Sequence, residues 1–115
     1  MAVAEAVPAD RLITAEGSAS VHDPHVWFDV EKWIAVSGAI LEALKEALPD
    51  NVSELQANFA VYEGKLLELK SYVESRVAEL EPSKRILVTA HDAFGYFGKA
   101  YGFEVLGLQG ISTVS

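Results

Sequence analysis

The chain has 115 residues, a formal net charge of −8 and no cysteine, and 50% of its residues are hydrophobic. This length is typical of one domain, and the apolar content is high enough to form a core, which argues against intrinsic disorder. The acidic residues are spread along the chain without a basic run, which argues against DNA or RNA as a partner, and the lack of cysteine excludes thiolate metal sites and disulfides.

The first 28 residues are expected to form a short strand followed by an irregular loop, because proline, glycine and serine interrupt their apolar runs. Asp29 is placed to cap a helix over residues 30–48, where apolar residues recur at helical spacing until Pro49. No stretch approaches the ~18 apolar residues of a membrane span. The N-terminus has no basic segment before an apolar one, so either the protein is cytoplasmic or its export signal lies outside this chain.

A second, longer helix is predicted to follow and to end before Pro82. Its apolar residues are three or four positions apart and share one face: Leu55, Phe59, Tyr62, Leu66, Leu69, Val73, Val77 and Leu80. Asp50, Asn51 or Ser53 could cap its start, the last in a capping box with Gln56. At about 1.5 Å per residue the helix would be roughly 40 Å long. Such a rod suits a coiled coil, a bundle or a strut between two bodies.

The rest of the chain is predicted to form a strand, a helix and a second strand, over residues 85–89, 91–101 and 103–106. The two strands of such a unit are parallel neighbours in one sheet. Because a two-stranded parallel sheet is not stable alone, the chain is expected to stop inside a domain.

Two of the three histidines are candidates for chemistry, because the common nucleotide, phosphate and nucleophile motifs are missing. His25 comes just before the first helix, where the preceding proline restrains the backbone and Trp27 can enclose the imidazole. His91 follows a strand of the parallel pair, where α/β folds usually bind ligands. Each could instead be structural, His25 as a helix cover and His91 as a turn residue beside a capping Asp92. His22 is expected to be an exposed bystander.

These histidines lie in two motifs, Asp-Pro-His-Val-Trp-Phe-Asp at 23–29 and Leu-Val-Thr-Ala-His-Asp-Ala-Phe-Gly-Tyr-Phe at 87–97. With Tyr-Gly-Phe-Glu-Val at 101–105 and Gly-Leu-Gln-Gly-Ile-Ser-Thr at 107–113, they resemble the solute-binding proteins of zinc/manganese ABC importers. The resemblance runs from about residue 2 to the end of the chain. It implies a helix-rich α/β fold with two lobes joined by one long helix, and a divalent cation held between the lobes by four side chains.

The resemblance assigns His25 to the second ligand of the N-terminal lobe and His91 to the first ligand of the C-terminal lobe. The other two ligands of the family, a histidine and an aspartate, have no counterpart here. The chain is therefore expected to be an internal fragment: residues 1–49 end the N-terminal lobe, 50–81 form the connecting helix, and 82–115 begin the C-terminal lobe with a βαβ unit.

The function that the resemblance implies is capture of a metal ion outside the cytoplasmic membrane, by a periplasmic protein or a membrane-anchored lipoprotein, and delivery to an ABC permease. The transported solute would be Zn²⁺ or Mn²⁺, and no enzymatic activity is expected. A histidine at position 91, rather than a carboxylate, favours zinc on ligand softness, but the motif at 107–113 also occurs in manganese binders. Both ions stay open.

Two other functions compete with this one. A zinc hydrolase could use His25 and His91 as ligands with Asp23 or Asp92 as base, although catalytic zinc usually has three protein ligands. A helical self-association module without metal binding would pair the long helix with a second chain, and uncovered apolar faces of a fragment would favour such pairing.

Overall fold

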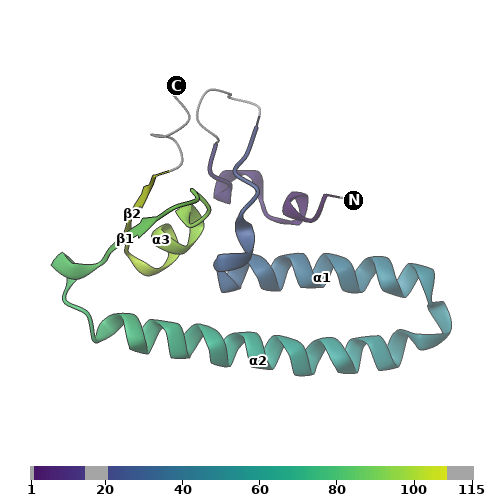
Figure 1. Ribbon diagram of the computed structural model, residues 1–115. Helices are drawn as coiled ribbons and strands as arrows, with labels where there is room; N and C mark the ends of the chain where they lie inside the picture. The colour runs from purple at the N-terminus through teal and green to yellow at the C-terminus, as the bar shows by residue number, and fades with distance from the viewer. Residues whose placement is uncertain (1, 15–20, 109–115) are drawn as a thin grey trace.

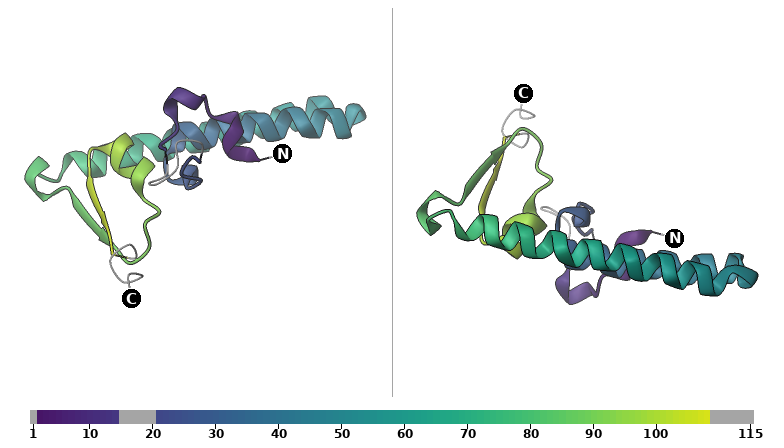
Figure 2. Two further views of the ribbon diagram at one scale, coloured as in Figure 1. Left: turned by 90° about the horizontal axis from the view of Figure 1, so that it is seen from above. Right: turned by 90° about the horizontal axis from the view of Figure 1, so that it is seen from below.

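The computed structural model describes residues 2–14 and 21–108. Two long antiparallel helices form a hairpin, a small strand–helix–strand unit lies at one end of it, and the N-terminal segment lies along the first helix (Figure 1). The molecule is elongated, with extents of 53 × 36 × 23 Å. The views from above and below show the long axis of the hairpin (Figure 2). The fold is helix-rich α/β, as the sequence predicts.

Helix α1, Val30–Ala47, begins at the predicted cap. One carboxylate oxygen of Asp29 accepts the amide of Glu31 at 3.0 Å and that of Lys32 at 3.4 Å. Both amides belong to the first turn, where the helix itself offers no acceptor. The helix stops just before Pro49, also as expected.

Helix α2, Val52–Ala78, has 27 residues and packs antiparallel against α1. The indole nitrogen of Trp33 donates a hydrogen bond to the Tyr62 hydroxyl at 2.9 Å and so joins the two helices. The predicted side-chain cap of α2 is wrong: Asn51, at the N-cap position, makes no side-chain hydrogen bond to the helix, and Ser53 lies inside the helix. The short 3₁₀ turn Pro49–Asn51, which contains Asp50, leads directly into the first helical turn. Leu66 is the one buried residue of α2, so the predicted apolar stripe is half-exposed along most of its length.

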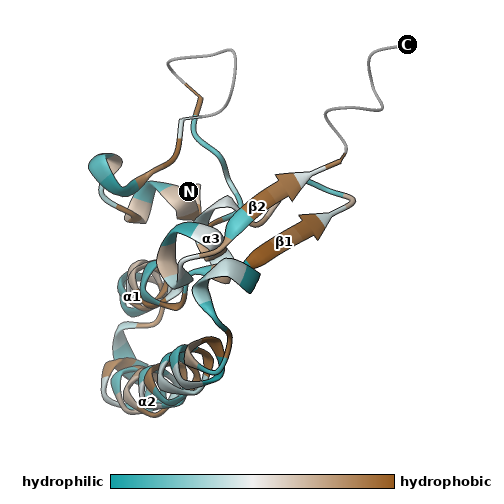
Figure 3. Ribbon diagram, turned by 90° about the vertical axis from the view of Figure 1, so that its left-hand side faces the viewer, coloured by the Kyte–Doolittle hydropathy of each residue, from teal (hydrophilic) through white to brown (hydrophobic). Residues whose placement is uncertain are grey.

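Strands β1, Ile86–Thr89, and β2, Glu104–Gly107, pair in parallel as predicted, from Ile86 opposite Glu104 to Thr89 opposite Gly107. Helix α3, Gly95–Tyr101, connects them and ends at Gly102, whose φ of 76° is the left-handed conformation that glycine adopts without strain. The two strands are largely hydrophobic (Figure 3), and Val88 is 57% exposed on one face of the sheet.

Several local predictions are wrong. Residues 2–14 contain the 3₁₀ turns Val3–Ala6 and Ala9–Arg11 instead of a strand, because this alanine-rich segment lacks the β-branched alternation that stabilises one. Helix α3 begins four residues later than expected, because the Ala93 amide donates to the carbonyl of His91 at 3.0 Å and makes a turn. The helix has no side-chain cap, so Asp92 does not have the predicted role.

The hydrophobic core lies where distant segments meet. Its fully enclosed members are Val7, Val26, Val36 and Tyr96, which come from the N-terminal segment, the loop before α1, α1 itself and α3. The strand–helix–strand unit is therefore packed against the N-terminal part of the chain as well as joined to it through α2. No helix of the described residues is long and apolar enough to cross a membrane.

Candidate metal centre

His25 and His91 face each other although 66 residues separate them in the sequence. Their Nε2 atoms are 3.3 Å apart, and their rings meet edge to face with centroids 5.2 Å apart and an interplanar angle of 79°. The structure therefore brings together the two histidines that the sequence singles out.

The imidazole of His25 is oriented by its own loop. A carboxylate oxygen of Asp23 lies 2.6 Å from Nδ1 and also accepts the backbone amide of His25 at 3.0 Å. The ring of Trp27 packs against the imidazole edge to face at 5.2 Å, as the sequence suggests. Because the carboxylate can only accept a hydrogen bond, Nδ1 carries the proton, and the lone pair of the neutral ring is on Nε2, which points at His91.

His91 lies just beyond the carboxyl end of β1, in the turn before α3, and its side chain is exposed. The next residue, Asp92, packs closely against the end of β2: a Cβ atom on Gly107 would lie only 2.7 Å from the Cβ of Asp92. The missing side chain at position 107 thus lets the turn that carries His91 lie close to the sheet.

The spacing of the two nitrogens suits a shared metal ion. Zinc–imidazole bonds of about 2.0–2.1 Å at a tetrahedral angle place two ligand nitrogens roughly 3.3 Å apart. The same spacing fits a hydrogen bond between the rings when no ion is bound, with Nε2 of His91 as donor. Across residues 2–14 and 21–108, no cluster of three or more metal-ligating side chains forms, so this region supplies a pair of imidazoles.

Sequence reasoning missed two contributors to this arrangement. Asp23 is hydrogen-bonded to the His25 ring. The Asp-Pro-His sequence, in which the proline restrains the backbone, is the signal that could have indicated this contact. Tyr96 reaches the same loop from α3 through its hydroxyl, which donates to the backbone carbonyl of Asp23 at 2.6 Å. No sequence pattern marks that contact. His22 is exposed and pairs through an isolated bridge with Thr14, in line with its expected role as a bystander.

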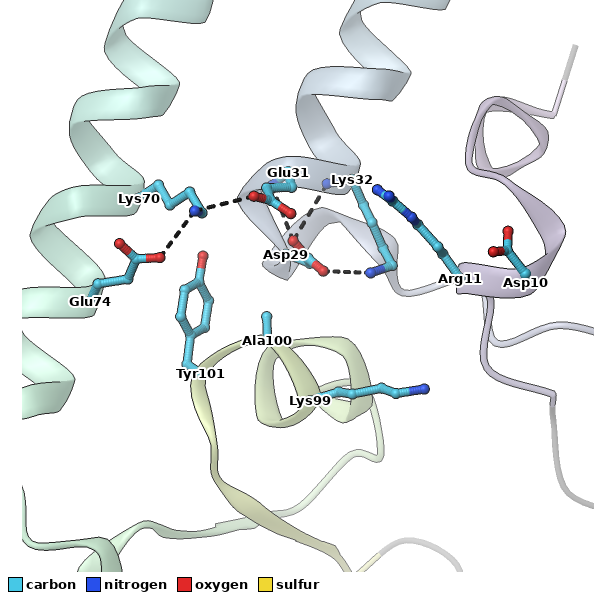
Figure 4. Close-up of a pocket in the computed structure, with 10 residues that line it drawn as sticks. All are labelled: Asp10, Arg11, Asp29, Glu31, Lys32, Lys70, Glu74, Lys99, Ala100 and Tyr101. Atoms are coloured by element: carbon cyan, nitrogen blue, oxygen red, sulfur yellow. Dashed lines mark hydrogen bonds and ion pairs between the residues drawn. The ribbon is translucent and has the colours of Figure 1, made fainter.

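A charged cavity of about 420 Å³ lies elsewhere, between α1, α2, α3 and the N-terminal segment (Figure 4). Neither candidate histidine lines it. Lys70 bridges Glu31 and Glu74 at 3.1 Å each, and these two carboxylates raise the pKa of Lys70. Lys32 pairs with the capping Asp29 at 2.6 Å. These ion pairs join α1 to α2 and stabilise the start of α1, so this part of the cavity is a polar junction between helices.

Comparison with known proteins agrees with the fold. A family model described as "Zinc-uptake complex component A periplasmic" matches residues 1–115. The zinc-binding protein TroA of Treponema pallidum is 44% identical over 115 residues, and the manganese-binding lipoprotein MntA of Bacillus subtilis is 43% identical over 114. These matches cover 100% and 99% of this chain but 37% of each relative.

The solved structure of the periplasmic zinc-binding protein TroA from Treponema pallidum, 44% identical, matches 100% of this chain with a TM-score of 0.91. The match covers 41% of that structure. A match along the entire chain, at this level of identity and structural agreement, leaves one assignment. The chain belongs to the zinc-uptake complex component A family, the metal-binding solute-binding proteins of ABC importers.

Proposed function

We propose that this chain is part of the high-affinity metal-binding component of an ABC importer, with Zn²⁺ or Mn²⁺ as the transported solute. His25 and His91 would each bind the ion through Nε2. The observation that carries this proposal is the 3.3 Å separation of these two nitrogens, which lie on segments 66 residues apart. Two ring nitrogens so placed provide two corners of a tetrahedral site.

The role of Asp23 follows from this assignment. Histidines that bind metals usually donate their other ring N–H to a carboxylate, carbonyl or water, which fixes the tautomer and makes the ligand nitrogen more basic. Asp23 is such a partner for His25, at 2.6 Å from Nδ1. The half-buried position of the imidazole, with 20% of its side chain exposed, also limits competition from water.

The choice between the two ions is open on chemical grounds, and both belong to the proposal. Imidazole nitrogen suits Zn²⁺ well and is acceptable to Mn²⁺, and the pair found here contains no carboxylate that would favour the harder ion. The relatives named above are described as zinc-binding and manganese-binding. Ligand softness favours zinc for this pair, but both ions stay in the proposal.

The whole importer component would act outside the cytoplasmic membrane and release its ion to an ABC permease, as a binding protein and not as an enzyme. A catalytic zinc needs three protein ligands, an open position and a general base. The described residues bring two imidazoles together, and the carboxylate that contacts His25, Asp23, is already hydrogen-bonded to its ring.

Calorimetric titration with Zn²⁺ and Mn²⁺ tests the ligand assignment. Because two imidazoles fill half of a tetrahedral site, we expect binding much weaker than that of a complete four-ligand site. His25→Ala and His91→Ala should each abolish it, whereas His22→Ala, the matched control, should leave it unchanged. Submicromolar 1:1 binding that survives His25→Ala would contradict both the affinity and the assignment.

Self-association is the second candidate, and the exposed apolar face of the sheet favours it. Ile86 and Val88 on β1 are 52% and 57% exposed, and Leu106 on β2 is 46% exposed. We expect light scattering to detect oligomers that Val88→Lys reduces. Val61→Lys, at a similarly exposed site on α2, should have no such effect. A monomer at all concentrations would exclude this candidate.

A further inference from the structure

Tyr96 is a fully buried residue of α3 whose hydroxyl is inserted between two backbone segments of the N-terminal part. The hydroxyl accepts the amide of Ile13 at 3.0 Å and donates to the carbonyl of Asp23 at 2.6 Å. Burial raises the pKa of this phenol above its ordinary value of 10.0, so the hydroxyl keeps its proton and can donate throughout the neutral range.

The hydroxyl replaces a backbone hydrogen bond. Thr14 and His22 form an antiparallel bridge, so the next pair, Ile13 and Asp23, would normally exchange two N–H···O bonds. One of them is present, from the Asp23 amide to the Ile13 carbonyl at 2.8 Å. The reciprocal bond runs through the hydroxyl of Tyr96, from the Ile13 amide to the Tyr96 oxygen and on to the Asp23 carbonyl.

The start of α3 lies equally close to this loop. A Cβ atom on Gly95 would lie 3.3 Å from the Ile13 side chain and 3.4 Å from a carboxylate oxygen of Asp23. The other oxygen of the same carboxylate holds His25. Asp23 thus lies against α3 through its backbone carbonyl and its carboxylate, and the same carboxylate contacts His25. On the other side of this contact, His91 lies only five residues before Tyr96 in the sequence.

We propose that Tyr96 is a positioning residue for the metal centre, whose hydroxyl ties α3 to the loop that carries His25 and sets the separation of the two imidazoles. The predicted effect on metal binding rests on the proposed function. The predicted effect of the Tyr96 hydroxyl on the separation of the two imidazoles does not require a bound ion. Loss of the hydroxyl would let the Ile13 amide pair directly with the Asp23 carbonyl. The loop would then close on itself and move relative to α3, while the chain stays folded.

The test compares Tyr96→Phe with Tyr101→Phe. Tyr101 is a matched control because it lies on the same helix, is also buried, and bonds through its hydroxyl to the backbone at Val30, the first residue of α1. The first readout is the nuclear Overhauser effect between the ring protons of His25 and His91 in metal-free protein. We expect it to weaken in Tyr96→Phe and to persist in Tyr101→Phe.

The second readout is the rate at which a chelator removes Zn²⁺. Because loss of a group that orients a ligand typically weakens metal binding by 10–100-fold, and Tyr96 acts one contact further away, we expect about three- to tenfold faster release in Tyr96→Phe. Equal release rates and equal ring contacts in the two variants would overturn the positioning role. Zinc binding that is unaffected by His25→Ala would overturn the proposed function instead, and the ring contact would still decide the role of Tyr96.

If Tyr96→Phe does not fold, the wild-type chain provides the decisive measurement. A hydrogen-bonded, buried hydroxyl proton exchanges slowly enough to be observed. We expect its resonance to show a contact with the Ile13 amide proton, and the absence of that contact would overturn the proposal.

Discussion

Asp23 connects several parts of the candidate metal centre. One carboxylate oxygen holds both the ring and the amide of His25, and its backbone carbonyl accepts the Tyr96 hydroxyl. The ionised carboxylate selects the tautomer with the proton on Nδ1, which leaves Nε2 as the ligand atom. Removal of its charge should therefore act on the metal through His25.

We predict that Asp23→Asn weakens Zn²⁺ binding by about tenfold, the lower end of the effect typical of such orienting carboxylates. The neutral amide has the same shape, so the fold should persist. Asp92→Asn is the matched control, because Asp92 adjoins the other histidine but packs against Gly107. Competition with a chelator measures both affinities, and equal losses in the two variants would contradict a specific role for Asp23.

The buried tyrosines predict how stability changes at alkaline pH. Burial is the main cause that raises the pKa of both Tyr96 and Tyr101 above the ordinary 10.0. A raised pKa means that the folded state retains these protons after the unfolded chain has lost them, so this stabilisation is complete below pH ~10 and is lost as pH rises further.

Urea unfolding between pH 8 and 11.5 measures this effect. The free energy of unfolding of the wild type should fall more steeply above pH ~10 than that of the double variant Tyr96→Phe/Tyr101→Phe. Tyr72→Phe, at a position that is 62% exposed, should retain the wild-type slope. The same slope in all three proteins would show that these phenols do not titrate differently on folding.

The two histidines could be found from sequence because each stands at a place where local structure favours ligand binding, and because their motifs resemble those of a known family. Their contact could not be predicted from local patterns, since it joins residues 66 positions apart. The contact of Tyr96 with Asp23 also joins residues far apart in the sequence, at 73 positions. Its acceptor is a backbone carbonyl, which every residue has, so no residue type in the sequence marks it.

At the level of elements, helix α3 and strand β2 are packed so closely that one position admits only glycine. A Cβ atom on Gly98 would lie 2.5 Å from the Val105 side chain and 2.9 Å from the Phe103 carbonyl oxygen. The backbone carbonyl cannot give way as a flexible side chain can. Gly64 in α2 is the opposite case, because a Cβ there would meet nothing within 4 Å.

We predict that Gly98→Ala destabilises the fold by about 2 kcal/mol, the usual cost of overpacking. Gly64→Ala should instead stabilise it by roughly 0.5–1 kcal/mol, because alanine favours the helical state. Thermal unfolding of both variants provides the measurement. Destabilisation by Gly64→Ala or tolerance of Gly98→Ala would contradict the packing described here.

The element boundaries that could be predicted are those set by local chemistry. Asp29 caps α1, Pro49 follows its end, and the apolar period distinguishes α2 from the two strands. The start of α3 could not be predicted, because a turn bond between Ala93 and His91 competes with the helix. That delay keeps His91 in a turn, from which it reaches His25.

At the scale of the whole molecule, the chain returns on itself. Because helices α1 and α2 are antiparallel, the strand–helix–strand unit that follows α2 lies next to the segment that precedes α1 (Figure 1). The core shared by Val26, Val36 and Tyr96 holds that contact. The predicted division into residues 1–49, 50–81 and 82–115 stays a prediction, and we propose that the metal ion lies where the first and third of these parts meet.

The central claim is that His25 and His91 share one ion through Nε2, and an NMR titration that reports the ring nitrogens tests it most directly. Long-range proton–nitrogen spectra of ¹⁵N-histidine-labelled protein report each ring nitrogen separately as diamagnetic Zn²⁺ is added. We predict that the Nε2 resonances of His25 and His91 shift together at the same stoichiometry, while Nδ1 of His25 keeps its proton and His22 does not respond. A shift at only one of the pair, or at His22 first, would contradict the account.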